Sequence, residues 1–290
     1  MSARHPIIAV TGSSGAGTSS IGRTFAEIFR REGVVAAFVD GHGFRRFGRA
    51  EMQQRVAEAA AAGNPHFSHF GPESNLFDAL ETLFRSYAET GTGRHRRYRE
   101  ELTEPHPPEA PFTPWEALPA NTDLLFYEGL HGGLSTAEVD IARHPDLLIG
   151  VVPVINLEWI QKLWRDKHLR GFSTEAVADT ILRRMPDYVN YICPQFSRSH
   201  VNFQHVPMVD TSNPFVAREV PSPEESMVVI RFRDPKGIDF PYLLSMIGGA
   251  FMSRATTIVV PGGKLNLAMQ LIFTPFVWRM MERRRKTLAS

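Results

Sequence analysis

A glycine-rich turn near the start of the chain constrains its fold more than any other feature. Residues 10–22 read VTGSSGAGTSSIG and follow an apolar run, HPIIAV, which is typical of a strand buried on both faces. After the turn, Ile21, Phe25 and Ile28 recur at helical spacing until Gly33. We therefore predict a strand, a glycine loop and a helix in that order, the arrangement that presents a helix N-terminus to phosphate groups.

The turn matches the phosphate-binding pattern G-x-x-x-x-G-K-[ST] at all but one position. Gly12, Gly17 and Ser19 occupy their places, but Thr18 stands where the lysine is expected. A dinucleotide-binding G-x-G-x-x-G turn does not fit, because Ser20 occupies its third glycine position. Loop N–H groups would bind phosphate oxygens, and the Ser19 hydroxyl would bind Mg²⁺. We expect the nucleotide to be held by Gly12, Ser13, Ser14, Gly15, Ala16, Gly17, Thr18 and Ser19.

The rest of the pattern predicts an α/β fold. The next apolar run, VVAAFVD, ends at Asp40 and completes a βαβ unit, so the sheet should be largely parallel. Prolines make 104–119 an irregular excursion. We predict one domain over 1–290, a P-loop nucleoside/nucleotide-kinase-like, doubly wound, mainly parallel sheet with insertions, whose ligand crevice lies at the carboxyl ends of the strands. Further strands are expected at 124–129, 146–154, 226–232 and 256–263, and helices at 50–62, 75–90, about 156–187 and, interrupted near Pro275, at the C-terminal end.

Charge and cysteine content exclude several classes of protein. A net charge of +1 argues against a surface built for nucleic acid. The single Cys193 rules out an intramolecular disulfide and is expected to be a buried, small apolar side chain. The apolar stretch at the start of the chain is too short for a signal peptide, and the longest near-apolar run, 147–155, is too short to span a membrane. We therefore expect a cytoplasmic protein without nucleic-acid or membrane partners.

Two further segments carry groups suited to phosphate chemistry. The apolar run LLFYEG ends in Glu128, where a second strand of a nucleotide fold often supplies an acid for the metal. The stretch EWIQKLWRDKHLRGFSTEA places Lys162, Arg165, Asp166 and Arg170 at three- and four-residue steps, on one face of a helix. A solvated charged face explains that spacing equally well. As a hypothesis, Lys162 or Arg165 replaces the cation that the glycine loop lacks.

Two basic segments, FRRFGR at 44–49 and GRHRRYRE at 93–100, mix arginines with aromatic residues. Alone, either could bind RNA. The nearly neutral total charge favours a phosphorylated small molecule instead, since the guanidinium fork suits a phosphate monoester.

Several segments together resemble one family over nearly the whole chain. TGSSGAGTSS, HFGPESN, LLFYEGLHG, IGVVPVINLEWIQK, DTSNPF and VVIRFRDPKGIDFPYLLSMI occur in the order found in bacterial phosphoribulokinases. That family also carries threonine at the lysine position of its phosphate loop. The resemblance implies ATP- and Mg²⁺-dependent phosphorylation of ribulose 5-phosphate to ribulose 1,5-bisphosphate, for carbon fixation in the Calvin cycle.

The resemblance also assigns roles to matched residues. Ser19 and Glu128 fall at metal positions, and Lys162 and Arg165 fall where the family assists the transferring phosphate, with Asp166 in the same motif. Arg49 and Arg170 fall at sugar-phosphate positions. Members of the family form large homo-oligomers activated by NADH, and the arginines matching their effector site are Arg31, Arg231 and Arg254.

The sequence departs from the family where the sugar should bind. The family pattern E-G-D-x-F-H-R-F is here D-G-H-G-F-R-R-F, so His42 replaces the presumed catalytic aspartate and Arg45 replaces a substrate-contacting histidine. Another family histidine aligns with Glu100. His42, Asp40 and Glu100 remain candidate proton acceptors, although a continuing strand would set Asp40 about 7 Å behind residue 42, too far for contact.

These departures leave three functions open. The first is a phosphoribulokinase. The second is a divergent paralogue that phosphorylates another sugar phosphate or polyol. The third is a nucleotide-binding regulatory protein without turnover.

Overall fold

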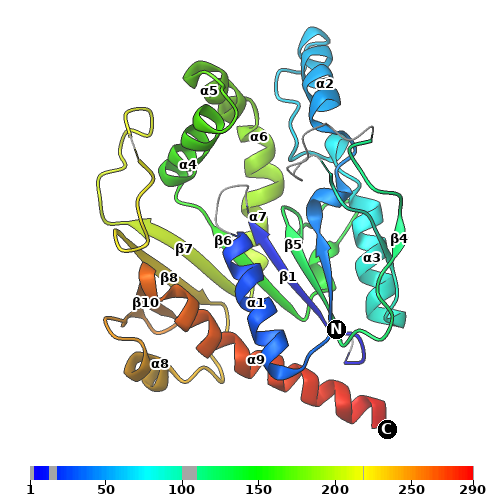
Figure 1. Cartoon of the computed structure of the whole chain (residues 1–290), viewed down its shortest axis with the longest axis vertical. Helices are drawn as coiled ribbons and strands as arrows, with labels where there is room; N and C mark the ends of the chain where they lie inside the picture. The colour runs from blue at the N-terminus through cyan, green and yellow to red at the C-terminus, as the bar shows by residue number, and fades with distance from the viewer. Residues whose placement is uncertain (1–2, 13–17, 100–109, 218, 290) are drawn as a thin grey trace.

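The chain forms one large mixed sheet with helices on both faces (Figure 1). The computed structural model describes residues 3–12, 18–99, 110–217 and 219–289. Strands are β1 (Ile7–Gly12), β2 (Ala36–Asp40), β3 (Arg94–His95), β4 (Glu116–Ala117), β5 (Leu124–Gly129), β6 (Leu147–Val152), β7 (Val201–Pro207), β8 (Ser226–Phe232), β9 (Phe251–Arg254) and β10 (Thr257–Pro261). Helices are α1 (Thr18–Glu32), α2 (Arg49–Ala61), α3 (Phe77–Thr90), α4 (Ile155–His168), α5 (Thr174–Arg183), α6 (Met185–Asp187), α7 (Cys193–Arg198), α8 (Phe240–Met246) and α9 (Leu265–Ala289).

The eight-stranded sheet has the order β2-β5-β1-β6-β7-β8-β10-β9. Its first five strands in that order run parallel, while β8, β10 and β9 are antiparallel to their neighbours. This confirms the predicted α/β, mainly parallel sheet. The short pair β3 and β4 forms a separate ladder beside α3.

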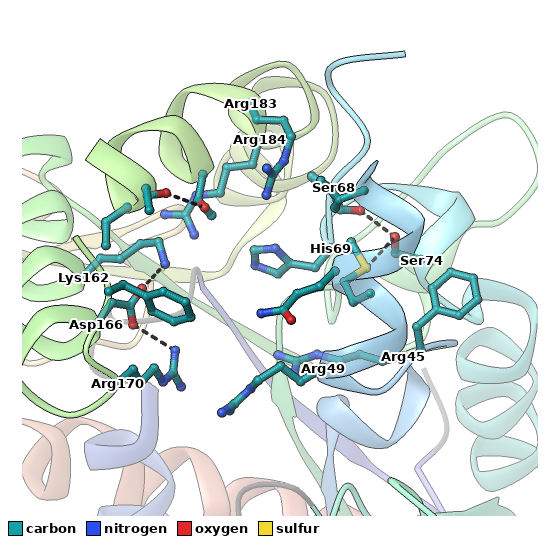
Figure 2. A pocket seen from close by; sticks show the side chains of 18 of the residues that line it. Arg45, Arg49, Ser68, His69, Ser74, Lys162, Asp166, Arg170, Arg183 and Arg184 are labelled. Carbon is teal, nitrogen blue, oxygen red and sulfur yellow. Dashed lines mark hydrogen bonds and ion pairs between the residues drawn. The ribbon is translucent and has the colours of Figure 1, made fainter. Parts of the chain in front are cut away.

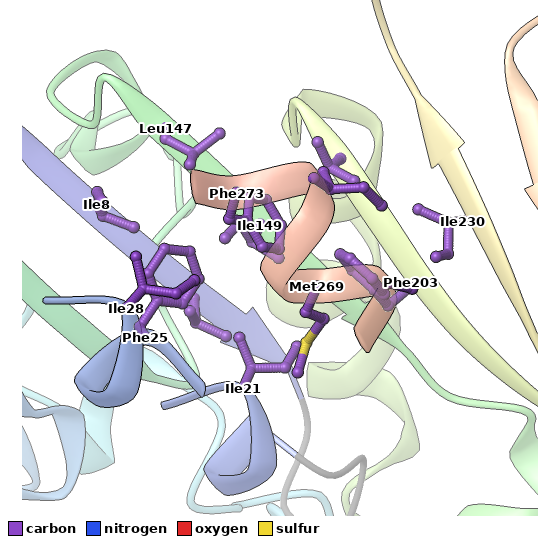
Figure 3. Close-up of a cluster of buried hydrophobic side chains, with 14 of the residues drawn as sticks. Ile8, Ile21, Phe25, Ile28, Leu147, Ile149, Phe203, Ile230, Met269 and Phe273 are labelled. Atoms are coloured by element: carbon purple, nitrogen blue, oxygen red, sulfur yellow. The ribbon is translucent and has the colours of Figure 1, made fainter. Parts of the chain in front are cut away.

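Each face of the sheet buries its own apolar layer. Ile8 and Val10 of β1 belong to the layer that includes α1, α8 and α9, whereas Ile7 and Ala9 belong to the layer that includes α3. The first layer is the larger one, with Phe25 and Phe273 packed against the strands (Figure 3). Burial on both faces explains why β1 is a continuous apolar run.

Short connecting elements add turns that the periodicity does not reveal. They are the 3₁₀ helices η1 (Gly41–Phe44), η2 (Pro72–Ser74), η3 (Ile141–Arg143) and η5 (Gly262–Lys264), and the π-helical turn η4 (Tyr188–Ile192). The expected helix at 156–187 is divided by Gly171, whose positive φ of 71° ends the first part.

Two expectations about single residues are wrong. The C-terminal helix is not interrupted at Pro275, because α9 continues through it; Phe273 and Val277, both buried against the sheet, hold the helix on either side of the proline. Cys193 is exposed at the start of α7, where the neighbouring Ile192 is buried instead. Among the described residues, no helix is both long and apolar enough to cross a membrane.

Candidate functional site

The predicted site elements leave the same edge of the sheet. In the parallel register, Gly12 at the end of β1 lies beside Val151 of β6, and Asp40 at the end of β2 lies beside Glu128 of β5. The glycine loop, η1 and α4 therefore all begin at the carboxyl edge, where α/β sheets bind ligands. Of the loop, Ser13, Ser14, Gly15, Ala16 and Gly17 lie outside the described residues, and α1 opens with Thr18 and Ser19.

The carboxylate of Glu128 lies against the first turns of α1. A Cβ placed on Gly22 would overlap Glu128 Oε2, so glycine is what allows this close approach. The predicted metal residue therefore lies beside the helix that follows the glycine loop. At this position a carboxylate can hold a metal ion, while the helix N-terminus favours the phosphate bound to that metal.

Asp40 is in direct contact with His42, contrary to the expectation of about 7 Å. The strand does not continue past Asp40; the chain turns into η1, whose N-cap is Asp40. Asp40 Oδ1 accepts a hydrogen bond from the His42 backbone at 2.9 Å and lies 3.2 Å from His42 Nδ1. Burial alone would raise the pKa of the Asp40 carboxyl, but the hydrogen bonds and charge of His42, with the charge of Arg45, lower it below its usual value.

The charged residues of α4, together with Arg170 just beyond the end of the helix, converge on one carboxylate. Asp166 is buried and pairs with Lys162 one turn earlier on α4. Its Oδ1 also lies 3.2 Å from Arg165 Nε and 2.9 Å from Arg170 Nη1. Burial works to raise the pKa of Asp166, yet Lys162 and Arg165 bring it below its usual value. Burial also lowers the pKa of Lys162, although Asp166 opposes that effect.

These groups line a cavity of about 360 Å³ between α4–α5 and the segment 45–74 (Figure 2). Lys162, Asp166 and Arg170 lie on one side of it, and Arg45 and Arg49 lie on the other. Half of the polar residues that line the cavity are lysine or arginine, and its volume suits a small ligand. A solvated face does not explain the burial of Lys162 and Asp166, although Arg165 is half-buried and Arg170 is exposed; the arrangement fits a ligand with phosphate groups.

His42 does not itself line the cavity. It lies three positions before Arg45, whose backbone N–H donates to the His42 carbonyl at 3.2 Å. The ring of Tyr98, which does line the cavity, is 6.3 Å from the His42 ring and 5.2 Å from the Arg45 guanidinium. His42 thus stands at the margin of the cavity, while Glu100 lies outside the described residues.

The basic segment 93–100 serves mainly to hold other parts of the site. Arg96 donates to the carbonyl oxygens of Gly43 at 2.7 Å and of Arg45 at 2.5 Å. Arg97 pairs with Glu116 at 3.4 Å. Of the two basic segments, only 44–49 places arginines around the cavity, because Arg96 uses its guanidinium to fix the turn after β2.

His69 and Arg184 are among the residues of the cavity wall that the sequence did not predict. His69 projects into the cavity, and Arg184 is buried beside it with Nη2 3.0 Å from Glu158 Oε1. His69 lies just before the segment FGPESN, but no spacing rule marks a single histidine in a loop. Arg184 belongs to the pair Arg183–Arg184 at the end of α5, which resembles an ordinary basic helix terminus.

The three predicted effector arginines lie away from this cavity. Arg231 and Arg254 both stand opposite Thr257, on the two strands that flank β10. Arg31, on α1, donates to Gln270 and Thr274 of α9. Their regulatory role stays a prediction.

Comparison with known proteins agrees with this architecture. The family model described as Phosphoribulokinase / Uridine kinase family matches residues 7–212. The chromosomal phosphoribulokinase of Cupriavidus necator is 71% identical, with 99% of both chains covered, and that of Nitrobacter vulgaris is 62% identical, with 98% and 99% covered. The solved phosphoribulokinase from Rhodobacter spheroides superposes with a TM-score of 0.91 at 56% identity, covering 98% of this chain and 100% of the other. The chain therefore belongs to the phosphoribulokinase and uridine kinase family, within which these full-length relatives are bacterial phosphoribulokinases.

Proposed function

We propose that this chain transfers the γ-phosphoryl group of ATP to ribulose 5-phosphate and forms ribulose 1,5-bisphosphate, which serves carbon fixation in the Calvin cycle. The carrying observation is the cation-lined cavity at the carboxyl edge of the sheet, with Lys162 and Arg165 on the helix that follows β6, the neighbour of β1. Phosphoryl transfer depends chiefly on positioning and charge neutralisation, which such a cluster supplies.

The two phosphate groups of the reaction would be bound by different cations of the cavity. A sugar hydroxyl attacks the γ-phosphorus, its new O–P bond forms as the bond to the β-phosphate oxygen breaks, and ADP leaves. Lys162 and Arg165 would stabilise the charge on the transferring group, and Asp166 holds both cations in place. Arg49 and Arg170 would bind the substrate's own phosphate, with Arg45 beside them.

The hydroxyl proton needs an acceptor, and we assign it to His42. Asp40 faces Nδ1 of His42, which favours the tautomer whose Nε2 can accept a proton. Asp40 then acts by orienting the imidazole. This choice replaces the family's aspartate with a histidine–aspartate pair; Asp40 or Glu100 as the direct acceptor are the alternatives.

ATP and Mg²⁺ would occupy the glycine loop and the region between Ser19 and Glu128. The contact of Glu128 with Gly22 fits a metal held at the start of α1. When bound, Mg²⁺ would neutralise part of the charge on the β- and γ-phosphates. The proposal also includes activation by NADH through Arg31, Arg231 and Arg254. It further includes a homo-oligomeric state and a cytoplasmic location.

An ADP-release assay with a panel of pentose and pentulose phosphates tests the proposal. Turnover selective for ribulose 5-phosphate supports it. Turnover with a different sugar phosphate or polyol favours the paralogue, which the changes at His42 and Arg45 make worth testing. ATP binding without any turnover favours the regulatory protein.

A variant pair tests the role of the cations. Lys162→Met should lower kcat by about 10²- to 10³-fold, since one charge aimed at the transition state is lost. The matched control is Lys167→Met, because Lys167 is exposed on the same helix and lies outside the cavity lining. Equal rates for the two variants would contradict the assigned role of Lys162.

A further inference from the structure

His69 is the cavity residue whose role the charge argument leaves unexplained. Its ring extends from the wall that carries Ser68 and Ser74 toward the opposite wall of Lys162 and Asp166 (Figure 2). The half-buried ring therefore stands between the two groups of cations rather than behind one of them.

The backbone around His69 is held by hydrogen bonds on both sides. Ser68 Oγ donates to Asp187 at 2.7 Å, and Ser74 Oγ donates to the Ser68 carbonyl at 2.7 Å. Asn75 Nδ2 donates to the carbonyl of His69 itself at 3.0 Å. A side chain on such an anchored segment is positioned before a ligand arrives, which is what a recognition group requires.

The surroundings of His69 keep its ring uncharged. Burial acts first, and the positive charges of Arg184, Arg45 and Lys162 act with it, so the pKa of His69 is held well below its usual value. A neutral imidazole has one N–H donor and one acceptor nitrogen.

Among the described lining residues, His69 is one of few side chains that can accept a hydrogen bond without giving up an ion pair; the others are Gln53, Tyr98 and the hydroxyls of Ser68, Ser74 and Thr180. Guanidinium and ammonium groups only donate hydrogen bonds. The carboxylate in the described lining, Asp166, already faces Lys162, Arg165 and Arg170. A phosphate group needs only donors, but every sugar hydroxyl also carries a hydrogen that needs an acceptor.

We propose that the neutral imidazole of His69 accepts a hydrogen bond from a hydroxyl group of the bound sugar phosphate. His69 thereby distinguishes a polyhydroxylated substrate from a simple phosphate, which the cations alone would bind equally well. This inference rests on the proposed function and adds to it one group that recognises the sugar rather than its phosphate.

The test compares His69→Phe with the wild-type protein by calorimetry and steady-state kinetics. Phe keeps a ring of similar shape and removes both nitrogens, so the KM and Kd for ribulose 5-phosphate should rise about tenfold or more. The KM for ATP and the inhibition constant of inorganic phosphate should stay unchanged. His69→Gln, whose amide oxygen can accept, should recover part of the affinity.

His66→Phe is the matched control, because His66 is exposed three residues earlier and lies outside the cavity lining. An unchanged Kd for ribulose 5-phosphate in His69→Phe would overturn the inference. So would a parallel loss of affinity for inorganic phosphate, since the ring would then act on the cations and not on the sugar.

The proposed function fails separately, through the wild-type protein. If the wild type turns over another sugar phosphate, the same variants are measured with that compound. An unchanged Kd for it in His69→Phe, or a parallel loss of affinity for inorganic phosphate, would again overturn the inference. If the wild type binds no sugar phosphate by calorimetry, the inference falls together with the proposed function.

Discussion

Asp40 and His42 are joined twice, through the backbone nitrogen of His42 at 2.9 Å and through its ring Nδ1 at 3.2 Å. The first contact caps η1, and the second fixes the direction of the imidazole. One carboxylate therefore sets both the turn after β2 and the orientation of the ring that replaces the family's aspartate.

Asp40→Asn should lower kcat about tenfold or more while leaving the KM for ATP unchanged, because an amide caps the turn but pairs less well with an imidazolium. Steady-state kinetics with ribulose 5-phosphate measure this. Asp210→Asn is the control, since Asp210 makes the same kind of cap with the Ser212 nitrogen at 2.8 Å on an exposed loop. If Asp40→Asn keeps the wild-type kcat, Asp40 does not orient the proton acceptor.

His42→Asp should raise kcat with ribulose 5-phosphate, because it restores the acid that the family carries there. A triphosphate raises the pKa of either base, but an aspartate starts from about 3.9 and a histidine from about 6.5, so the aspartate remains available as a base at neutral pH. The comparison needs only initial rates at saturating ATP. A rate that stays equal or falls would mean that this position does not limit turnover.

Gly22→Ala should weaken the Mg²⁺ dependence of the reaction, because the added methyl group must displace the Glu128 carboxylate. Helix propensity favours alanine by about 1 kcal/mol, so the thermal midpoint should not fall much. A titration of rate against Mg²⁺ concentration would show a higher half-saturating value. The control is Ala26→Ser, which changes an exposed position of the same helix. Gly63→Ala is less suitable, because Gly63 has a positive φ of 87° that alanine rarely adopts.

His131 should make the fold sensitive to mild acid. It is buried, its Nε2 lies 3.0 Å from the Phe70 carbonyl, and burial lowers its pKa to about 4. Between that value and the usual 6.5, the unfolded chain binds a proton that the folded chain excludes, so stability is lost as the pH falls through this window. The loss is about 3 kcal/mol, at 1.36 kcal/mol per pKa unit.

Urea unfolding at several pH values measures this loss. His131→Gln keeps a donor for the Phe70 carbonyl and does not titrate, so its unfolding free energy should fall less between pH 7 and pH 4 than that of the wild type. Parallel curves for the two proteins would show that His131 is protonated in the folded state.

Arg184→Met should lower the unfolding free energy by about 3–5 kcal/mol, because it leaves the buried Glu158 charge without its cation. Arg184 and Glu158 are 3.0 Å apart, and both are buried. Adding Glu158→Gln removes that charge and keeps an acceptor for Tyr188, whose hydroxyl donates to Glu158 at 3.2 Å. The double variant should therefore be more stable than Arg184→Met; if it is less stable, the pair is not held by charge.

Local patterns in the sequence were sufficient for the elements near the site. The apolar run before Gly12 predicted β1, and the four-residue step from Lys162 to Asp166 predicted two neighbours on one helix face, because both depend only on the period of a strand or a helix. The matched motifs likewise indicated the family from the sequence alone.

Contacts between distant segments depended on the tertiary structure. The α9 helix passes through Pro275 because packing against the sheet outweighs the local cost of the proline. Asp40 reaches His42 because the chain turns at the end of β2, where Arg96, more than fifty residues away, binds the Gly43 and Arg45 carbonyls. The segment that carries His69 is held by the bond from Ser68 to Asp187 and the bond from Asn75 to the His69 carbonyl, which no periodicity encodes. By itself, then, the sequence determined the elements and the cations at the carboxyl edge, since these follow from backbone period and residue type. Only the tertiary structure decided which groups face one another across the cavity, because that depends on loops fixed by residues far apart in the chain.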